Sequence, residues 1–174
     1  MIESKRLKFR NIRVEDTDNV LKWRNSPVVQ NNFIYRSEVT REDHLNWLKN
    51  RVETGQVIQL IITEKDTDKP IGSVYVRDID KENMTGEYGI FIGEDLARGK
   101  GYGSETALRI VRYFFDDLKF KELTLRVLTR NTSAITSYKK AGFKVYKTDT
   151  IDIEGTKEDI SYMSVCNRDS IDGE

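Results

Sequence analysis

The chain has 174 residues, 37% of them hydrophobic and 33% charged, which is the size and composition of one folded domain. Lys plus Arg and Asp plus Glu both number 29, so nothing in the overall charge favours nucleic acid or anionic lipid as a partner. One cysteine, Cys166, excludes an internal disulfide, and a single histidine argues against a zinc site. No apolar run approaches the roughly 18 residues that span a bilayer, and no export signal opens the chain, so we expect a cytoplasmic protein without membrane partners.

The first half of the chain alternates strand and helix patterns. Alternating apolar residues predict a strand over residues 7–12, and a helix follows that Pro27 closes. A loop over residues 31–39 leads to a second helix, which begins with an approximate capping box at Thr40 and Asp43 and ends near Gly55. His44 lies on the polar side of that helix pattern, so we expect it at the surface. Three β-rich runs then predict an antiparallel meander over residues 57–64, 71–79 and 87–92.

The second half contains the clearest helix pattern of the chain. Its apolar stripe falls at i, i+4, i+7 and i+11 and is formed by Ala107, Val111, Phe114 and Leu118. Further patterns predict strands over residues 123–128, 143–148 and 159–165, a short helix over residues 133–141, and a polar connection over residues 150–157. We therefore expect one domain over residues 1–166, followed by a poorly ordered tail over residues 167–174.

A glycine-rich run, Arg98-Gly99-Lys100-Gly101-Tyr102-Gly103, joins the meander to the clearest helix. A strand end, a glycine turn and a helix start direct backbone N–H groups and the positive end of the helix dipole at one point, which favours a phosphate or a similar anion. The spacing does not fit a Walker A loop, because Gly101 rather than Ser or Thr follows Lys100, and it does not fit the G-x-G-x-x-G fingerprint of dinucleotide sites. The alternative is a helix-capping turn that holds no ligand.

The spacing Arg-x-x-Gly-x-Gly, from Arg98 to Gly103, resembles the acetyl-CoA pyrophosphate loop of the GCN5-related N-acetyltransferase (GNAT) family. A second stretch, from Asn131 through Tyr138 to Phe143, resembles the family signature N-x-x-A-x-x-x-Y-x-x-x-G-F, and the order of predicted elements agrees. The resemblance implies an α/β (α+β) fold of the GNAT type, with a mixed, mostly antiparallel central sheet of about seven strands flanked by about four helices. It points to the ribosomal-protein N-terminal acetyltransferase-like and amino-sugar acetyltransferase-like branch.

The resemblance also implies acetyl-CoA as the acetyl donor. Arg98 and Lys100 are then expected to face its phosphates, with Gly101 and Gly103 allowing close backbone approach. The implied cofactor-binding set is Phe91, Ile92, Gly93, Arg98, Gly99, Lys100, Gly101, Tyr102, Gly103, Ser104, Asn131 and Lys140. Two members have simpler alternatives, a helix cap for Asn131 and a solvated helix lysine for Lys140. No metal ligand is expected.

Acetyl transfer to an amine requires that the amine lose a proton and that the departing thiolate gain one. Glu87 is the predicted base, because it lies on the strand before the glycine loop and period-two alternation places it on one face with Gly89 and Phe91. Its alternative is a solvated strand glutamate. Tyr138 matches the general acid of the family, and its alternative is a core tyrosine packed beside Ile135.

The acceptor side is predicted from Trp23, Arg24 and Asn25, together with Tyr35 in the following loop. These residues resemble those of acetyltransferases that modify nucleotide-activated amino sugars, where an arginine and aromatic rings suit a nucleotide diphosphate, but they also suit plain packing. We therefore expect a small-molecule amine acceptor, first a nucleotide-linked amino sugar. The alternatives are a ribosomal-protein N-terminal α-amino group, then a polyamine, then a CoA-binding module without turnover. The resemblance also allows a homodimer.

Overall fold

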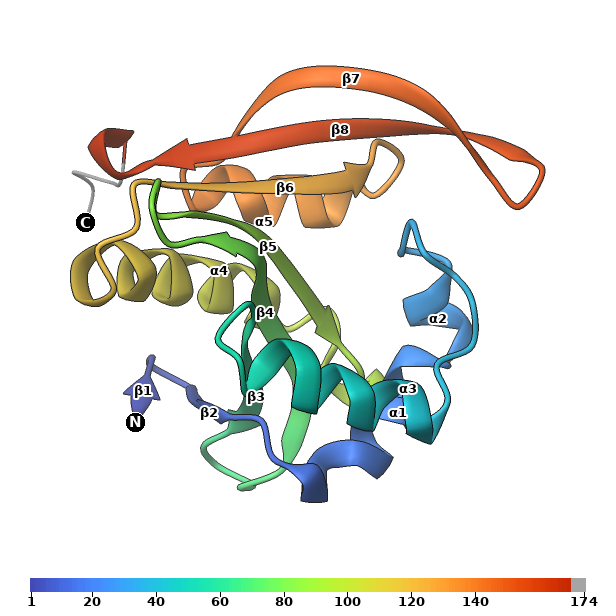
Figure 1. Cartoon of the computed structure of the whole chain (residues 1–174), viewed down its shortest axis with the longest axis vertical. Helices are drawn as coiled ribbons and strands as arrows, with labels where there is room; N and C mark the ends of the chain where they lie inside the picture. Colours follow the sequence, from blue (N-terminus) through green and yellow to red (C-terminus); the bar gives the residue numbers. More distant parts are fainter. Residues whose placement is uncertain (170–174) are drawn as a thin grey trace.

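The fold is built on one eight-stranded sheet in the order β1-β2-β3-β4-β5-β6-β8-β7 (Figure 1). The computed structural model describes residues 1–169. Its strands are β1 Ile2–Glu3, β2 Leu7–Asn11, β3 Ile58–Glu64, β4 Pro70–Asp80, β5 Thr85–Ile92, β6 Glu122–Leu128, β7 Lys144–Ile153 and β8 Thr156–Cys166. All neighbours pair antiparallel except β5 and β6, which pair parallel. The predicted mixed, mostly antiparallel sheet is confirmed, with one strand more than expected because β1 pairs with β2.

Five α-helices flank the sheet within the described residues: α1 Thr17–Arg24, α2 Pro27–Gln30, α3 Arg41–Trp47, α4 Tyr102–Arg112 and α5 Thr132–Lys140. α3 and α4 each continue into a π-helical turn, Leu48–Val52 and Tyr113–Asp117. The helix that was not expected is α2. Pro27 begins it rather than closing α1, because proline at the first helical position has a suitable φ and lacks only an N–H that would stay unpaired there.

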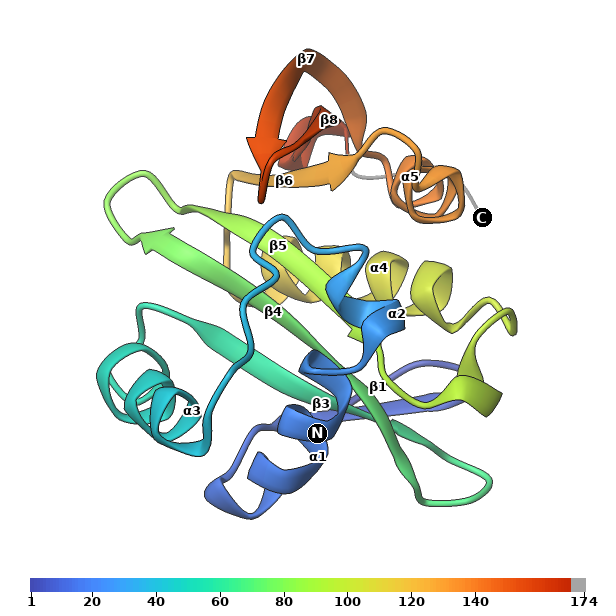
Figure 2. The same cartoon turned by 90° about the vertical axis from the view of Figure 1, so that its right-hand side faces the viewer.

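The helices cover both faces of the sheet (Figure 2). α4 and α5 pack on one face, where Ile110 and Tyr138 belong to the larger core cluster. The other face carries α1, α2 and the turn after α3, where Trp23, Val29 and Leu48 form a second cluster. Strand β5 serves both clusters, because successive side chains of a strand point to opposite faces.

β5 and β6 separate after a short parallel stretch. The pairing joins residues 85–87 of β5 to residues 122–124 of β6 and goes no further. β5 continues along β4 as far as Ile92, while β6 continues along β8 as far as Leu128. Residues 88–92 therefore pair with a strand on the β4 side alone within the described chain. The Ile92 carbonyl on the opposite side accepts from Arg98, and the other backbone groups on that side are free to meet a ligand.

The β7–β8 hairpin is longer than predicted. Pairing runs from Lys144 opposite Ser164 to Ile153 opposite Thr156. The turn residues Glu154 and Gly155 have φ values of 52° and 83°, the positive values that suit a tight hairpin. Residues 150–157, predicted as a polar connection, are therefore mostly strand.

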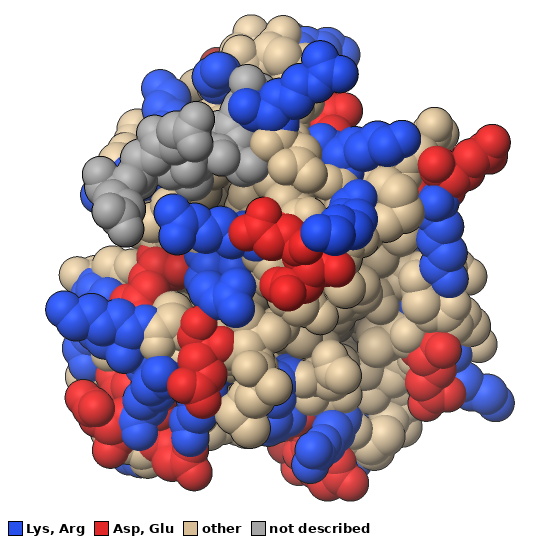
Figure 3. Space-filling model, turned by 90° about the vertical axis from the view of Figure 1, so that its left-hand side faces the viewer, with Lys and Arg blue, Asp and Glu red and all other residues tan. Residues whose placement is uncertain are grey.

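The end of the chain also differs from the expected tail. Residues 167–169 form a 3₁₀ turn, and the Asn167 N–H donates to the Lys121 carbonyl at 2.9 Å. Residues 170–174, the rest of the predicted tail, lie outside the described residues. Figure 3 shows acidic and basic side chains interspersed on one face, in keeping with the equal numbers of the two signs. None of the helices within residues 1–169 has the length and apolar character needed to cross a membrane.

Candidate active site

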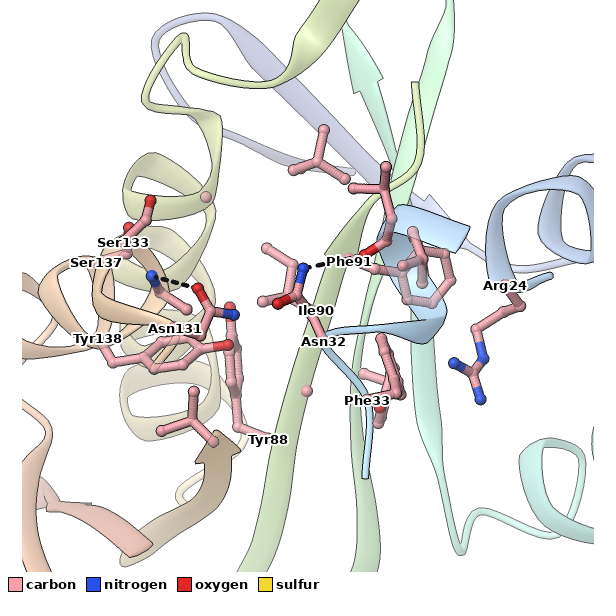
Figure 4. Close-up of a pocket in the computed structure, with 18 of the residues that line it drawn as sticks. Arg24, Asn32, Phe33, Tyr88, Ile90, Phe91, Asn131, Ser133, Ser137 and Tyr138 are labelled. Carbon is pink, nitrogen blue, oxygen red and sulfur yellow. Dashed lines mark hydrogen bonds between the residues drawn. The ribbon is translucent and has the colours of Figure 1, made fainter. Parts of the chain in front are cut away.

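A cavity of about 1140 Å³ lies where β5 and β6 separate. Figure 4 shows its two sides: Tyr88, Asn131 and Tyr138 lie on one, here named the α5 side, and Arg24 and Phe33 lie on the other, here named the α1 side. The volume lies just above the usual range for small-molecule sites, so there is room for an elongated ligand and a second molecule.

The glycine-rich loop forms the end of the cavity at the N-terminus of α4. Gly99 and Gly101 have φ values of 74° and 79°, the left-handed region that glycine adopts without steric cost, and Gly101 is the N-cap of the helix. A glycine cap has no side chain to accept the first helical N–H groups, so these groups and the helix dipole are available to an anion. Gly99, Gly101, Tyr102, Gly103 and Ser104 all line the cavity.

The two cations of this loop are engaged by the protein itself. Arg98 donates to the Ile92 carbonyl at 3.1 Å and to the Gly93 carbonyl at 2.9 Å. Lys100 lies 3.7 Å from the Glu64 carboxylate and does not line the cavity. Lys100 therefore does not take the expected position, whereas Arg98 also lines the cavity, so its contact with a phosphate stays a prediction. Carbonyl groups at the end of β5 take up the guanidinium, which ties the loop to the strand.

Most of the predicted cofactor set lines this cavity. The lining residues are Phe91, Ile92, Arg98, Gly99, Gly101, Tyr102, Gly103, Ser104, Asn131 and Lys140. Gly93 does not, because Trp23 packs against it so closely that an added Cβ would lie 2.0 Å from the indole. Gly93 therefore serves close packing between β5 and α1.

Tyr138 and Asn131 are placed by α5. The Asn131 side chain accepts from the Ala134 N–H at 3.3 Å, which caps the helix, and the residue also lines the cavity. Tyr138 is almost fully buried, yet its hydroxyl has no hydrogen-bond partner among the described residues. Burial raises the pKa of Tyr138, and the neighbouring Tyr75 raises it further. A phenol with a raised pKa stays protonated at neutral pH and can serve as a proton donor.

Tyr88 is a cavity residue that sequence reasoning missed. Its side chain is 3% exposed, and its hydroxyl is buried without a partner in the described chain. Its ring lies 5.9 Å from that of Tyr138 and 5.8 Å from that of Phe143, measured between centroids. A buried hydroxyl without a partner costs about 1–3 kcal/mol. The available signal was strand alternation, which places Tyr88 on the face opposite Glu87.

Glu87 lies on the α1 side of the cavity between two arginines. Its Oε1 accepts from Arg77 at 2.6 Å and from Arg126 at 3.0 Å. Its other carboxylate oxygen, Oε2, forms no hydrogen bond with the described residues and is available to a substrate or a water molecule. Both arginines line the cavity and were not predicted, because their approach depends on the register of Arg77 with Glu87 and on the path of β6.

Arg24 is a cation on the α1 side that has no ion-pair partner among the described residues. Its guanidinium lies 3.9 Å above the Phe33 ring, and one of its terminal nitrogens is buried without a hydrogen bond. Burial lowers the pKa of Arg24, since the charged form is desolvated. Tyr35, 67% exposed, lines the same side. Both predicted residues are thus at the cavity.

Trp23 and Asn25, also predicted to bind substrate, are not among the lining residues. Trp23 is 1% exposed, packs on Phe91 and donates to Glu94 at 2.7 Å. The Asn25 amide exchanges hydrogen bonds of 2.9 and 2.8 Å with the backbone of Val39 and so holds the loop. Successive side chains of a helix point in different directions around its axis. Arg24 therefore faces the cavity while its neighbours in the chain face elsewhere.

His44 is buried rather than exposed, which corrects the expectation from the helix pattern. It is 3% exposed, lines the cavity, and its Nε2 has no partner in the described chain. Burial lowers the pKa of His44, so the imidazole is neutral at pH 7.

Comparison with known proteins agrees with this geometry. Residues 6–144 match the family model described as an acetyltransferase (GNAT) domain. The chain belongs to the GNAT acetyltransferase family. Acetyltransferase PseH of Campylobacter jejuni is 27% identical over 144 residues, covering 81% of this chain and 85% of that protein. An uncharacterised protein of Methanocaldococcus jannaschii is 27% identical over 146 residues, and the match covers 83% of this chain but only 29% of that longer protein.

The fold is that of solved GNAT structures. A spermidine N-acetyltransferase from Vibrio cholerae, solved in complex with CoA and spermine, superposes with a TM-score of 0.88 over 95% of this chain and 98% of that one. At 17% identity, this likeness concerns the fold.

The GNAT acetyltransferase has an arrangement that fits acetyl-CoA, the acetyl donor of its family. An uncapped helix N-terminus suits the pyrophosphate. The separated edge of β5 offers backbone groups to an extended amide arm, and Tyr138 lies on the α5 side beside it. When bound, acetyl-CoA supplies an activated acetyl group as a thioester.

Replacement of Gly101 by alanine is expected to weaken both the loop and the protein. A non-glycine residue at the observed φ of 79° costs about 1–3 kcal/mol, although the nearest side-chain atom, on Arg6, leaves room at 3.6 Å. Urea unfolding measures the loss of stability, and calorimetry measures the loss of CoA affinity. Arg112→Ala, in the last turn of α4 and outside the cavity, is the control that leaves backbone strain and the loop unaltered.

Proposed function

We propose that this acetyltransferase acetylates the primary amine of a small molecule that also carries negative charge, and that a nucleotide-linked amino sugar fits best. The observation that carries the proposal is the half-buried Arg24, whose guanidinium stacks on Phe33 at the α1 side and has one buried nitrogen without a hydrogen bond. An arginine above an aromatic ring offers charge and stacking together, which suits a phosphate or carboxylate on a ligand with a flat group.

The charge balance of the α1 side favours an anionic acceptor over a polyamine. Its charged lining residues are Arg24, Arg77, Arg126, Glu87 and Asp43. Asp43 is occupied in the capping box of α3, and Glu87 faces two arginines. A polycation would meet more positive than negative charge here, whereas an acidic ligand would find complementary charge.

The order of the candidate acceptors follows the resemblance found in the sequence. That resemblance places an amino-sugar acceptor first, and the similarity to acetyltransferase PseH over most of both chains supports acetyl transfer itself. A ribosomal-protein-type N-terminal α-amino group is the second candidate and a polyamine the third. The likeness to spermidine N-acetyltransferase rests on the fold, so it does not move the polyamine ahead. A CoA-binding module without turnover is the last alternative.

The mechanism proposed is direct attack of the amine on the acetyl carbonyl carbon in a ternary complex. Glu87 takes a proton from the amine through its free Oε2, directly or through one water molecule. Tyr138 gives its hydroxyl proton to the departing sulfur. The C–N bond forms as the C–S bond breaks, and the new amide nitrogen then loses its second proton, which restores the Tyr138 hydroxyl. Glu87 releases the proton that it took to solvent, so Glu87 ends ionised and Tyr138 ends protonated.

Glu87→Gln is expected to lower kcat/KM at least about tenfold at pH 7. The deficit should shrink as the pH rises toward the pKa of a free amine, about 10, because the amine then loses its proton without help. A pH profile of initial rates measures this. Glu122→Gln, on the adjoining strand β6 and outside the cavity, is the control. A profile shape that stays like the wild type would assign the base role to another group.

Thiol release from acetyl-CoA tests enzyme against binding module. The panel contains an amino-sugar nucleotide, a ribosomal-protein N-terminal peptide and spermidine. Calorimetric binding of acetyl-CoA with no thiol release above the amine-free rate would leave only the non-catalytic alternative. Absence of acetyl-CoA binding by well-folded protein would reject the donor site itself.

A cytoplasmic location and a homodimer stay predictions. Light scattering measures whether the protein is a homodimer.

A further inference from the structure

The hydroxyl of Tyr88 is not explained by packing. Its ring fills the space between Tyr138 and Phe143, with an angle of 82° between its plane and that of Tyr138. A phenylalanine would fill that space equally well, as Phe143 does at the neighbouring position. The hydroxyl adds a buried polar group that no described residue pairs with. Such a group is understandable where a ligand supplies the missing partner.

The position of Tyr88 restricts which atom of a ligand can be the hydrogen-bond partner of its hydroxyl. Tyr88 is the first residue of β5 beyond the stretch paired with β6, so it lies where the two strands begin to separate and lines the cavity there. Its neighbour in the chain is Glu87, the proposed base, and its neighbour in space is Tyr138, the proposed acid. Figure 4 shows the two phenols side by side on the α5 side. The reacting end of the donor, rather than its phosphates at the α4 N-terminus, belongs here.

We propose that the Tyr88 hydroxyl donates a hydrogen bond to the carbonyl oxygen of the bound acetyl thioester. This inference rests on the proposed function, since it requires acetyl-CoA as the donor. This hydrogen bond strengthens as negative charge develops on that oxygen during attack, and a hydroxyl that is already held in place needs little reorganisation. Tyr88 keeps its proton throughout, while Tyr138 gives its proton to sulfur. Burial raises the pKa of Tyr88 well above its usual value, so the hydroxyl remains a donor.

The test compares two ligands that differ only in the acetyl group. Tyr88→Phe is expected to bind acetyl-CoA about three- to tenfold more weakly than the wild type. It should bind CoA, which lacks the carbonyl, within about twofold of the wild type. Calorimetry measures both constants. Tyr146→Phe is the matched control, because Tyr146 is 59% exposed on β7, away from the cavity. Equal changes for both ligands, or no change, would overturn the inference.

A spectroscopic measurement that starts from the wild-type protein provides a second test. Acetyl-CoA labelled with ¹³C at the carbonyl, bound to the wild-type protein without acceptor, is expected to show a carbonyl resonance moved downfield from that of free acetyl-CoA. In Tyr88→Phe the resonance should return toward the free value, and in Tyr146→Phe it should not. An unmoved resonance in the wild type would overturn the role of Tyr88 while leaving the donor site intact. Failure of both acetyl-CoA and CoA to bind would instead reject the proposed function.

Discussion

Replacement of Tyr138 by phenylalanine is expected to lower kcat at least about tenfold. The dissociation constant of acetyl-CoA should stay within about twofold, because the ring keeps its contacts with Tyr88 and Phe143 and only the hydroxyl is lost. The physical reason is that the departing thiolate loses its proton source. Single-turnover kinetics together with calorimetry separate the chemical step from binding.

The pH dependence of kcat in the wild type gives a second check on the role of Tyr138. Burial raises the folded-state pKa of Tyr138, so the acid form persists through the neutral range and is lost only when the pH rises through that raised value. We expect no alkaline fall in kcat from this group below about pH 10. Tyr113→Phe, in the turn after α4 and outside the cavity, should leave kcat unchanged. Equal turnover in Tyr138→Phe would remove Tyr138 from the mechanism.

Replacement of Arg24 by glutamine is expected to raise the KM of an acidic acceptor about ten- to hundredfold, with kcat and acetyl-CoA affinity little changed. Arg24 has no ion-pair partner in the described chain, so the change breaks no salt bridge, and it removes a desolvated charge. The folded protein should therefore be at least as stable as the wild type, which thermal unfolding measures. Steady-state kinetics with the acceptor varied measures KM.

The control for this substitution is Arg41→Gln. Arg41 forms an exposed pair with Asp18 and does not line the cavity, so the same loss of charge should leave KM unchanged. For spermidine, removal of Arg24 should lower KM rather than raise it, since a repulsive charge is removed. A KM for the acidic acceptor that is unaltered in Arg24→Gln would separate Arg24 from acceptor recognition and return it to packing with Phe33.

Local sequence patterns predicted the parts of the site that a single element determines. The glycine loop and the start of α4 follow from Gly99 and Gly101, whose positive φ values the turn requires. Period-two alternation correctly placed Glu87 and Phe91 on one face of β5, toward the second core cluster. Asn131 begins α5, as its place before the helix pattern indicated.

The remaining features depend on contacts between elements. Arg98 points to the carbonyls at the end of β5 because that strand ends beside it, which spacing along the chain does not reveal. Tyr88 becomes a cavity residue because β6 leaves β5 directly before it. Trp23 and Arg24 are neighbours in the sequence, yet the rotation of α1 buries one and directs the other to the cavity. Each depends on a tertiary arrangement that no short pattern encodes.

The most direct test of the proposed function is the ratio of kcat/KM for two acceptors, an amino-sugar nucleotide and spermidine, measured by thiol release from acetyl-CoA. The excess of arginine on the α1 side predicts a ratio of at least about one hundred in favour of the amino-sugar nucleotide. A ratio near or below one would contradict acceptor selection by Arg24 and its neighbours.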